Sequence, residues 1–278
     1  MSLHGTRLFV SAATARALQS VCHKNNEGVS LYQQGRCVEA VNSLKEAVST
    51  TKAFLKQCLD VEEGTPTVFE LCISLQVMPS KMDNQASDID SFVDSTVYSK
   101  LFKIEVILLS DAEASLQQQM MQGDGNDGEP CLLFSILSSM LIFNFALAHH
   151  SLAITSREGN VTGTRNFLSK SLVLYGLAYK SLHGELRHEI IDPDMLQLLV
   201  QAILNNLGQC YATLDDTENF KACCKLLLRR IFLFQHHQSR TGNIGSNEDR
   251  NSDDQSIAFF LKNALFLILK DRGFAPAA

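Results

Sequence analysis

Three asparagines at matching positions form the pattern with the clearest chemical meaning in this sequence. Asn26, Asn144 and Asn206 each lie two residues before a glycine or an alanine, in segments whose apolar spacing is helical. A glycine within a helix costs about 1 kcal/mol, so a small residue there usually marks the close approach of another helix. A side-chain amide offers a donor and an acceptor, which suits an extended peptide backbone. The three residues therefore predict a row of amides that holds either a peptide or a neighbouring backbone carbonyl.

Residues that could carry catalysis or hold a metal do not fall at the required spacing. Adjacent His149 and His150 point to different helix faces, whereas helical metal ligands are usually four residues apart. His188 and Glu189 begin like a zinc-protease motif, but Asp192 stands at the position of the second histidine. The sequence contains no phosphate-binding glycine loop and no nucleophile elbow. We therefore expect no enzyme activity, no metal and no cofactor.

The composition indicates which cellular compartment and which kinds of partner to expect. The 278 residues hold 24 Lys and Arg against 30 Asp and Glu, for a net charge of −6, and 45% of them are hydrophobic. Nucleic-acid affinity rests on Lys and Arg that neutralise phosphates, so we expect no nucleic-acid partner. The eight cysteines include no CxxC pair, and no secretory signal is evident. Reduced, mostly buried thiols in an intracellular, cytoplasmic protein are the interpretation that follows.

Two segments leave other locations open. The first acidic residue is Glu27, and the stretch before it carries Arg7 and Arg16 among Ser and Ala, as organelle transit peptides do. Residues 131–148 hold no charge over eighteen positions, which meets the lower limit for a membrane span. They also contain three serines and Asn144, and no Lys or Arg cluster flanks them. A buried helix at the centre of a helical stack explains the run more simply.

Most of the chain has helical periodicity. Apolar spacing predicts a first antiparallel helix hairpin over residues 16–58, broken at Gly35, and further hairpins over residues 131–183 and 194–237. Residues 255–272 are apolar nearly all round, so we expect a final helix that packs on the last hairpin and caps the stack.

The region after the first hairpin has the periodicity of strands. Over residues 66–110, apolar and polar residues alternate once before Pro79 and again around Phe102, which predicts two paired strands. A linker is expected over residues 111–130 and a flexible loop over residues 238–254, because both are rich in Gly, Asn and Asp.

Residues 21–54 resemble a tetratricopeptide repeat (TPR), the helix–turn–helix unit of about 34 residues. Gly28 takes the small position of the first helix, and Ala40, Leu44 and Ala47 take the small, large and small positions of the second. The family's early aromatic is replaced by Lys24, and its closing proline by Lys52. Residues 201–234 are similar through Leu207, Gly208 and Tyr211, and residues 139–182 through Ala146, Ser171, Tyr175 and Ala178.

The resemblance implies a mainly α fold. Its form would be a right-handed superhelical stack of TPR-like antiparallel helix hairpins, in a single domain over residues 1–278, with a small β-strand pair inserted after the first hairpin. Single repeats cannot bury their own apolar faces, so three stacked units and a cap are physically consistent.

The resemblance also implies a binding surface, because the first helices of such arrays line a concave groove. The residues that it places there are Asn25, Asn26, Val29, Gln33, Asn144, Leu147, His150, Asn205, Asn206 and Gln209. Some members of the family use an Asn at this offset to hold the backbone of a bound peptide, and Asn26, Asn144 and Asn206 match it. The Lys and Arg carboxylate clamp of chaperone-tail binders is not seen, so that ligand is not expected.

The implied function is a non-catalytic protein–protein interaction scaffold that binds a peptide segment of another protein in this groove. If Asn26, Asn144 and Asn206 bind a partner, their joint replacement by alanine abolishes capture and leaves helix content and melting nearly unchanged. A loss of folding would make them structural. Two alternatives stay open: a small-molecule-binding regulatory protein with a polar pocket near Cys72, Glu105 or His150, and a membrane-associated helical protein. The sequence also leaves open whether the chain's own β insertion occupies the groove.

Overall fold

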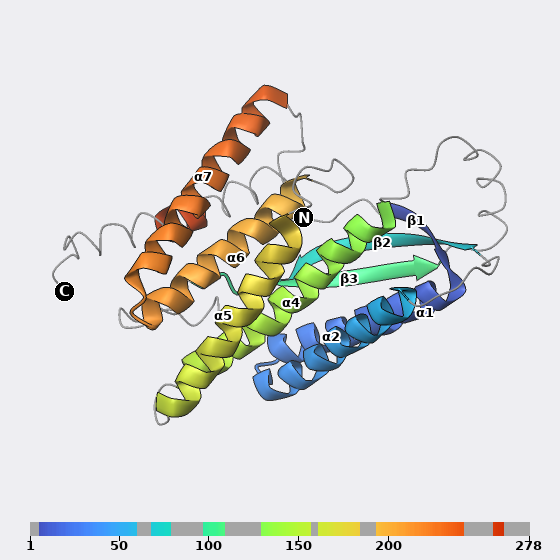
Figure 1. The fold of residues 1–278 in the computed structure, drawn as a ribbon, viewed down its shortest axis with the longest axis horizontal. Helices are drawn as coiled ribbons and strands as arrows, with labels where there is room; N and C mark the ends of the chain where they lie inside the picture. Colours follow the sequence, from blue (N-terminus) through green and yellow to red (C-terminus); the bar gives the residue numbers. More distant parts are fainter. Residues whose placement is uncertain are drawn as a thin grey trace.

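Helix hairpins and a small sheet make up the described part of the protein. The computed structural model describes residues 6–59, 68–78, 97–108, 129–156, 161–183, 193–241 and 258–263. The helices, in consecutive pairs, are α1 (Ala12–Gln33) and α2 (Cys37–Leu59), α4 (Glu129–Thr155) and α5 (Val161–His183), and α6 (Pro193–Thr213) and α7 (Thr217–Thr241) (Figure 1). The strands are β1 (Thr6–Ser11), β2 (Val68–Met78) and β3 (Leu101–Leu108).

The first and third hairpins turn in the same way. Gly35, the predicted break, has a φ of 81°, and Asp215 has a φ of 61° at the corresponding place. The N–H of Arg36 donates to the C=O of Leu31 (3.0 Å), and the N–H of Asp216 donates to the C=O of Tyr211 (2.9 Å). This bond across five residues closes a helix that ends in a left-handed residue. The two hairpins therefore repeat at a constant offset, since 215 − 35 and 206 − 26 are both 180.

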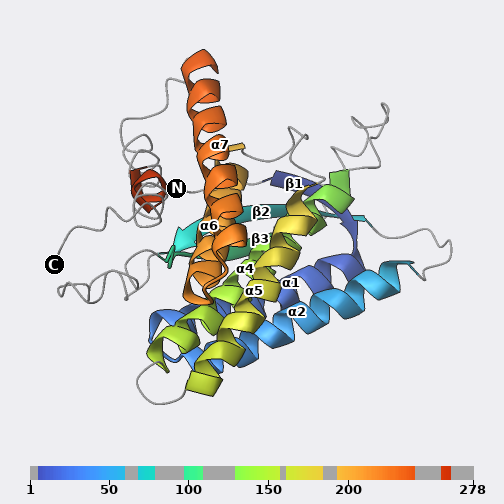
Figure 2. The ribbon, with the colours of Figure 1, turned by 60° about the vertical axis from the view of Figure 1, so that its left-hand side comes forward.

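The pairs pack in chain order. Helix α2 of the first pair lies against α4 of the second, and α5 of the second lies against α6 of the third. Strand β3 contacts the first helices α1 and α4, so the sheet lies along the side of the stack that these helices form (Figures 1 and 2). A large buried core made of residues from all six helices and β3 holds the arrangement together.

The sheet has one strand more than the sequence predicts. The predicted pair is confirmed as β2 and β3, which are antiparallel from Leu71↔Leu108 to Met78↔Leu101. Strand β1 extends the order to β1-β2-β3. Residues 6–11 are short and have no apolar–polar alternation, and their partners Val68 to Ile73 are about 60 residues away in the chain. Sequence periodicity therefore carries no signal for β1.

Other predicted boundaries need small corrections. Helix α7 continues to Thr241, so residues 238–241 of the predicted loop are helical. Helix α4 begins at Glu129, inside the predicted linker. Residues 258–263 of the predicted final helix are helical, and their contacts are with Tyr98 and with Asn205 of α6. The remainder of the predicted linker and loop lies outside the described residues.

The apolar run of α4 lies inside the protein. Residues 135–155 are long and apolar enough to cross a membrane by length and composition, and 83% of the most apolar window is buried within the chain itself. Helix α4 packs against α5 on one side and α2 on the other. Burial between neighbouring hairpins accounts for a helix that is apolar nearly all round.

The small residues after the asparagines differ in how closely another helix approaches. A Cβ on Gly28 would lie 2.6 Å from Cγ of Leu44, which is closer than real Cβ contacts come. A Cβ on Gly208 would lie 3.6 Å from Cβ of Cys223, an ordinary contact. Glycine is therefore required by packing at position 28 but not at position 208.

Candidate functional site: the asparagine-lined groove

The three matching asparagines bind an extended segment of the chain itself. Residues 97–104 comprise the approach to β3 and its first half, and they pass in turn under α6, α4 and α1. Asn206 binds Tyr98, Asn144 binds Phe102, and Asn26 binds Ile104. The helices that the sequence places on a concave surface thus face one continuous peptide segment, which we call the groove segment.

Each asparagine binds both polar groups of a single residue. The N–H of Tyr98 donates to Oδ1 of Asn206 (2.8 Å), and Nδ2 of Asn206 donates to the C=O of Tyr98 (3.0 Å). The same pair of bonds joins Asn144 to Phe102, at 3.0 and 2.7 Å. It also joins Asn26 to Ile104, at 3.0 and 2.6 Å. The side-chain amide acts as a neighbouring peptide group would in an antiparallel sheet.

These bonds close the outer edge of the sheet along the first half of β3, at Phe102 and Ile104. Within an antiparallel strand, alternate residues direct their N–H and C=O groups to the same side. Phe102 and Ile104 direct theirs to the asparagines, so Lys103 between them directs its own toward Gln76 of β2. An edge strand normally presents unpaired backbone groups that invite other strands. Asn144 and Asn26 form hydrogen bonds with the backbone groups of Phe102 and Ile104, so another strand cannot pair with them there.

A second row of amides supports the first. Nδ2 of Asn25 donates to the C=O of Phe102 (3.1 Å) and to Oδ1 of Asn26 (3.2 Å), and Nδ2 of Asn144 donates to Oδ1 of Asn25 (2.9 Å). In the third hairpin, Nδ2 of Asn205 donates to Oδ1 of Asn206 (3.1 Å) and Oδ1 of Asn205 accepts from Asn263 (3.1 Å). The amides orient one another, so the contacts to the groove segment are preorganised.

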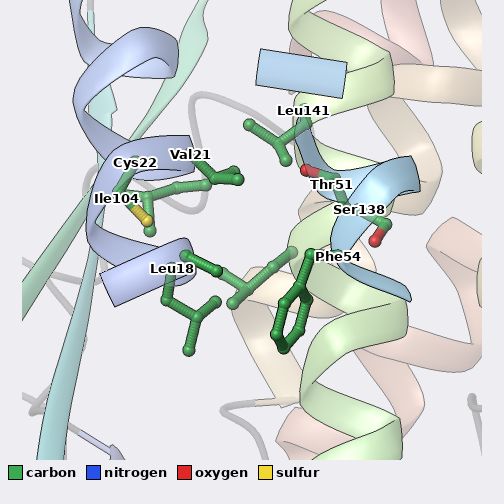
Figure 3. A pocket seen from close by; sticks show the side chains of 10 residues that line it. Leu18, Val21, Cys22, Thr51, Phe54, Ile104, Ser138 and Leu141 are labelled. Atoms are coloured by element: carbon green, nitrogen blue, oxygen red, sulfur yellow. The ribbon is translucent and has the colours of Figure 1, made fainter. Parts of the chain in front are cut away.

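Buried side chains also hold the groove segment in place. Phe102 is fully buried, with its ring edge against Phe143 of α4 at 5.4 Å between centroids. Ile104 is also fully buried and faces a pocket with Leu18 of α1 and Leu141 of α4 (Figure 3). The predicted alternation is confirmed, since Lys103 and Glu105 are partly exposed and form an ion pair at 2.6 Å.

The structure brings most of the predicted site residues into one buried layer. Asn25, Asn144, Asn205 and Asn206 lie under the groove segment, and Asn26 is half-buried beside it. The remaining predicted residues lie further along the same helices, where Gln33 is half-buried and the others are buried: Val29, Leu147, His150 and Gln209. None of the ten presents an open surface for a partner while the groove segment is in place.

Sequence reasoning missed the residues on the other side of these contacts. Tyr98, Phe102 and Ile104 supply the bound backbone, and Tyr175 of α5 accepts a hydrogen bond from Nδ2 of Asn206 (3.1 Å). Asn263, near the C-terminus, completes the amide network. The alternation around Phe102 was a signal for a strand with one buried face, but nothing in the sequence relates that strand to the asparagines.

Titratable groups near the groove are held in their neutral forms. Burial lowers the pKa of His150 to about 4 and raises the pKa of Cys22 to about 12. Burial also raises the pKa of Cys37, so neither Cys22 nor Cys37 is activated as a nucleophile. Within the described residues, no three His, Cys, Asp or Glu side chains gather in a way that could hold a metal.

The buried imidazole makes stability depend on pH. The folded pKa of His150 lies below its ordinary value of 6.5, so the unfolded chain takes up a proton first as the pH falls. The resulting stability is complete above pH 6.5 and is lost as the pH falls toward 4. We expect His150→Gln to reduce the loss of unfolding free energy between pH 7 and pH 5 by about 2 kcal/mol. Urea titrations at both pH values measure it, and equal losses in the two proteins would contradict it.

Comparisons of the chain with protein-family models, with curated proteins and with solved structures found no match. The class of protein must therefore be inferred from the groove and its contacts.

Proposed function

We propose that this chain is a non-catalytic interaction protein whose asparagine-lined groove binds an extended peptide segment, with its own residues 97–104 as the resident ligand. The observation that carries the proposal is the repeated bidentate contact of Asn26, Asn144 and Asn206 with one continuous backbone. In this proposal the hairpins form a TPR-like right-handed stack, and its concave surface recognises backbone groups rather than particular side chains.

The order of packing and the repeated geometry support the proposal. The asparagines come from the first helix of each successive pair, and they meet the groove segment at Tyr98, Phe102 and Ile104. Main-chain hydrogen bonds give such complexes their affinity, and buried side chains give them specificity. Phe102 and Ile104 fill that second role for the resident segment.

The resident segment competes strongly because it is tethered. Attachment to the same chain can give a segment an effective concentration on the order of 1 mM. A partner peptide of equal intrinsic affinity, present at about 1 μM, would therefore enter roughly one groove in a thousand. Exchange requires a partner that binds much more tightly, or an event that detaches the groove segment.

Cutting the tether tests the groove as a binding site. Protease sites placed within residues 79–96 and within residues 109–128 would leave residues 97–108 as a separate peptide after cleavage. We expect a fluorescent peptide with the sequence of residues 97–108 to bind the cut protein, and to bind the intact protein far more weakly. Fluorescence anisotropy follows the exchange.

Two modified peptides show what the groove recognises. N-methylation at Phe102 removes the donor to Oδ1 of Asn144 and should abolish binding. Exchange of Lys103 for Glu and Glu105 for Lys keeps the backbone and should leave affinity within a few-fold. A cut protein that releases its own peptide and takes up no labelled one would overturn the proposed function.

A further inference from the structure

Helix α7 has a buried face and an outer face of different character. Its inner face packs on α6 through buried residues at helical spacing: Phe220, Cys223, Cys224, Leu227, Ile231 and Phe234. On the outer face, large apolar side chains are exposed, with Leu226 at 38%, Leu233 at 54% and Phe232 at 62%. Large exposed apolar residues gathered along one helix mark an interaction site more often than scattered ones do.

The exposed residues form a seam of the kind that pairs helices. Ala222, Leu226, Arg229, Leu233 and His236 are all exposed and follow one another at steps of four, three, four and three residues. This spacing is that of the a and d positions of a coiled coil, where a partner helix inserts its side chains. The seam runs over four turns of α7.

The charge of this face is opposite to that of the chain as a whole. Residues 219–241 contain the cations Lys221, Lys225, Arg229, Arg230 and Arg240 and no Asp or Glu, in a chain of net charge −6. Lys225 and Arg230 flank the seam at Leu226 and Arg229. Within the described part of the chain, the ion pairs join residues other than Lys225, Arg229 and Arg230.

The position of α7 explains why this face is uncovered. Helices α2 and α5 each pack against the first helix of the next hairpin, and α7 is the second helix of the last one. Figure 2 shows α7 at the edge of the molecule, with its upper half projecting beyond α6. The helical residues 258–263 contact Tyr98 and Asn205, and Leu226, Phe232 and Leu233 stay exposed.

From this face we infer a second interaction surface, independent of the groove: the outer face of α7 docks an acidic amphipathic helix of another protein. The partner helix lays its apolar seam on Ala222, Leu226 and Leu233. Its carboxylates, at the positions flanking that seam, meet Lys225 and Arg230, and one carboxylate on the seam meets Arg229. The partner helix would then pack on α7 as α4 packs on α2 and α6 packs on α5.

The arrangement of charges favours a protein helix over a lipid surface. A helix that lies in a membrane interface keeps its cations on a polar face, away from an uninterrupted apolar one. Here Arg229 lies on the seam between Leu226 and Leu233, and Lys225 lies between that seam and Phe232. The apolar side chains of α7 are thus separated by charges, which suits paired side chains and not insertion into acyl chains.

A designed helical peptide tests the surface on the intact chain. The probe is a fluorescent four-heptad peptide with Glu at the flanking positions and Leu at a and d, except for one central Glu that faces Arg229. Its control has Lys in place of every Glu. We expect the acidic peptide to bind with an affinity that falls as salt rises, and the basic peptide not to bind. Absence of binding by the acidic peptide, or equal binding of both, overturns the inference.

Matched substitutions locate the binding. Leu233→Asp and the double variant Arg229→Glu, Arg230→Glu should each weaken the acidic peptide at least about tenfold. Leu177→Asp changes a similarly exposed leucine of α5 and should leave affinity unchanged. Circular dichroism confirms that the variants stay folded. If Leu233→Asp matches the wild type, or if the chain binds phosphatidylserine vesicles in place of the peptide, the inference is wrong.

Discussion

Replacing Asn144 by alanine is expected to lower the free energy of unfolding by about 3 kcal/mol. The substitution leaves the buried N–H of Phe102 and Oδ1 of Asn25 without their partners, and each orphaned group costs about 1–3 kcal/mol. The C=O of Phe102 keeps the bond from Nδ2 of Asn25, which limits the loss. Urea denaturation followed by circular dichroism measures the effect. The sequence predicts nearly unchanged melting only if the asparagines bind a partner, whereas the intramolecular contact predicts a loss of stability.

Two companion variants control this experiment. Asn42 is exposed on α2, so Asn42→Ala removes an asparagine from a helix without orphaning a buried group, and stability should hold or rise slightly. Asn144→Asp keeps the size and the acceptor for Phe102 but loses the donors, and the buried carboxylate should make this variant gain stability relative to the wild type as the pH falls. If Asn144→Ala is no worse than Asn42→Ala, the amide contacts do not stabilise the fold.

Replacing Phe102 by alanine is expected to cost about 3–5 kcal/mol, which is typical for a fully buried phenylalanine. The change empties the space beside Phe143 and removes the edge-to-face contact between the two rings. Because the Phe102 side chain is a buried anchor of the groove segment, the segment should detach before the helices unfold. Denaturant titration gives the free energy, and proteolysis within the groove segment reports the detachment.

Lys103 provides the matched control on the same strand. Its side chain is one-third exposed, and its ion pair with Glu105 lies at the surface, so Lys103→Ala should cost less than about 1 kcal/mol. Equal losses for Phe102→Ala and Lys103→Ala would show that the groove does not hold the segment through Phe102.

The sequence predicts the local features of this protein well, because local physics decides them. The turn at Gly35, the start of the third hairpin near residue 194 and the alternation around Phe102 depend on neighbouring residues, and the structure confirms them. The backbone-binding role of Asn26, Asn144 and Asn206 also follows from residue type and position. The sequence interpretation left open whether that backbone belongs to another protein or to the chain itself, and in the structure it is the chain's own.

The remaining features depend on contacts between distant segments. Asn26 and Ile104 are 78 residues apart, and Asn206 and Tyr98 are 108 apart. No periodicity in the sequence encodes which strand meets which helix face. Strand β1 was missed for the same reason, because its pairing with β2 exists only in the folded chain. A row of asparagines that binds a strand of the same chain has the same sequence pattern as a row that binds another protein.

Hydrogen exchange at Tyr98, Phe102 and Ile104 tests the central claim most directly. The amides of Phe102 and Ile104 lie on the side of β3 away from β2, and the amide of Tyr98 lies just before β3. Each of the three donates to Oδ1 of an asparagine. Nuclear magnetic resonance of the intact wild-type protein should show slow exchange at all three amides, comparable with the helix cores. In Asn144→Ala, exchange should accelerate most at Phe102. Wild-type exchange at Phe102 and Ile104 as fast as in an unprotected edge strand would contradict the account.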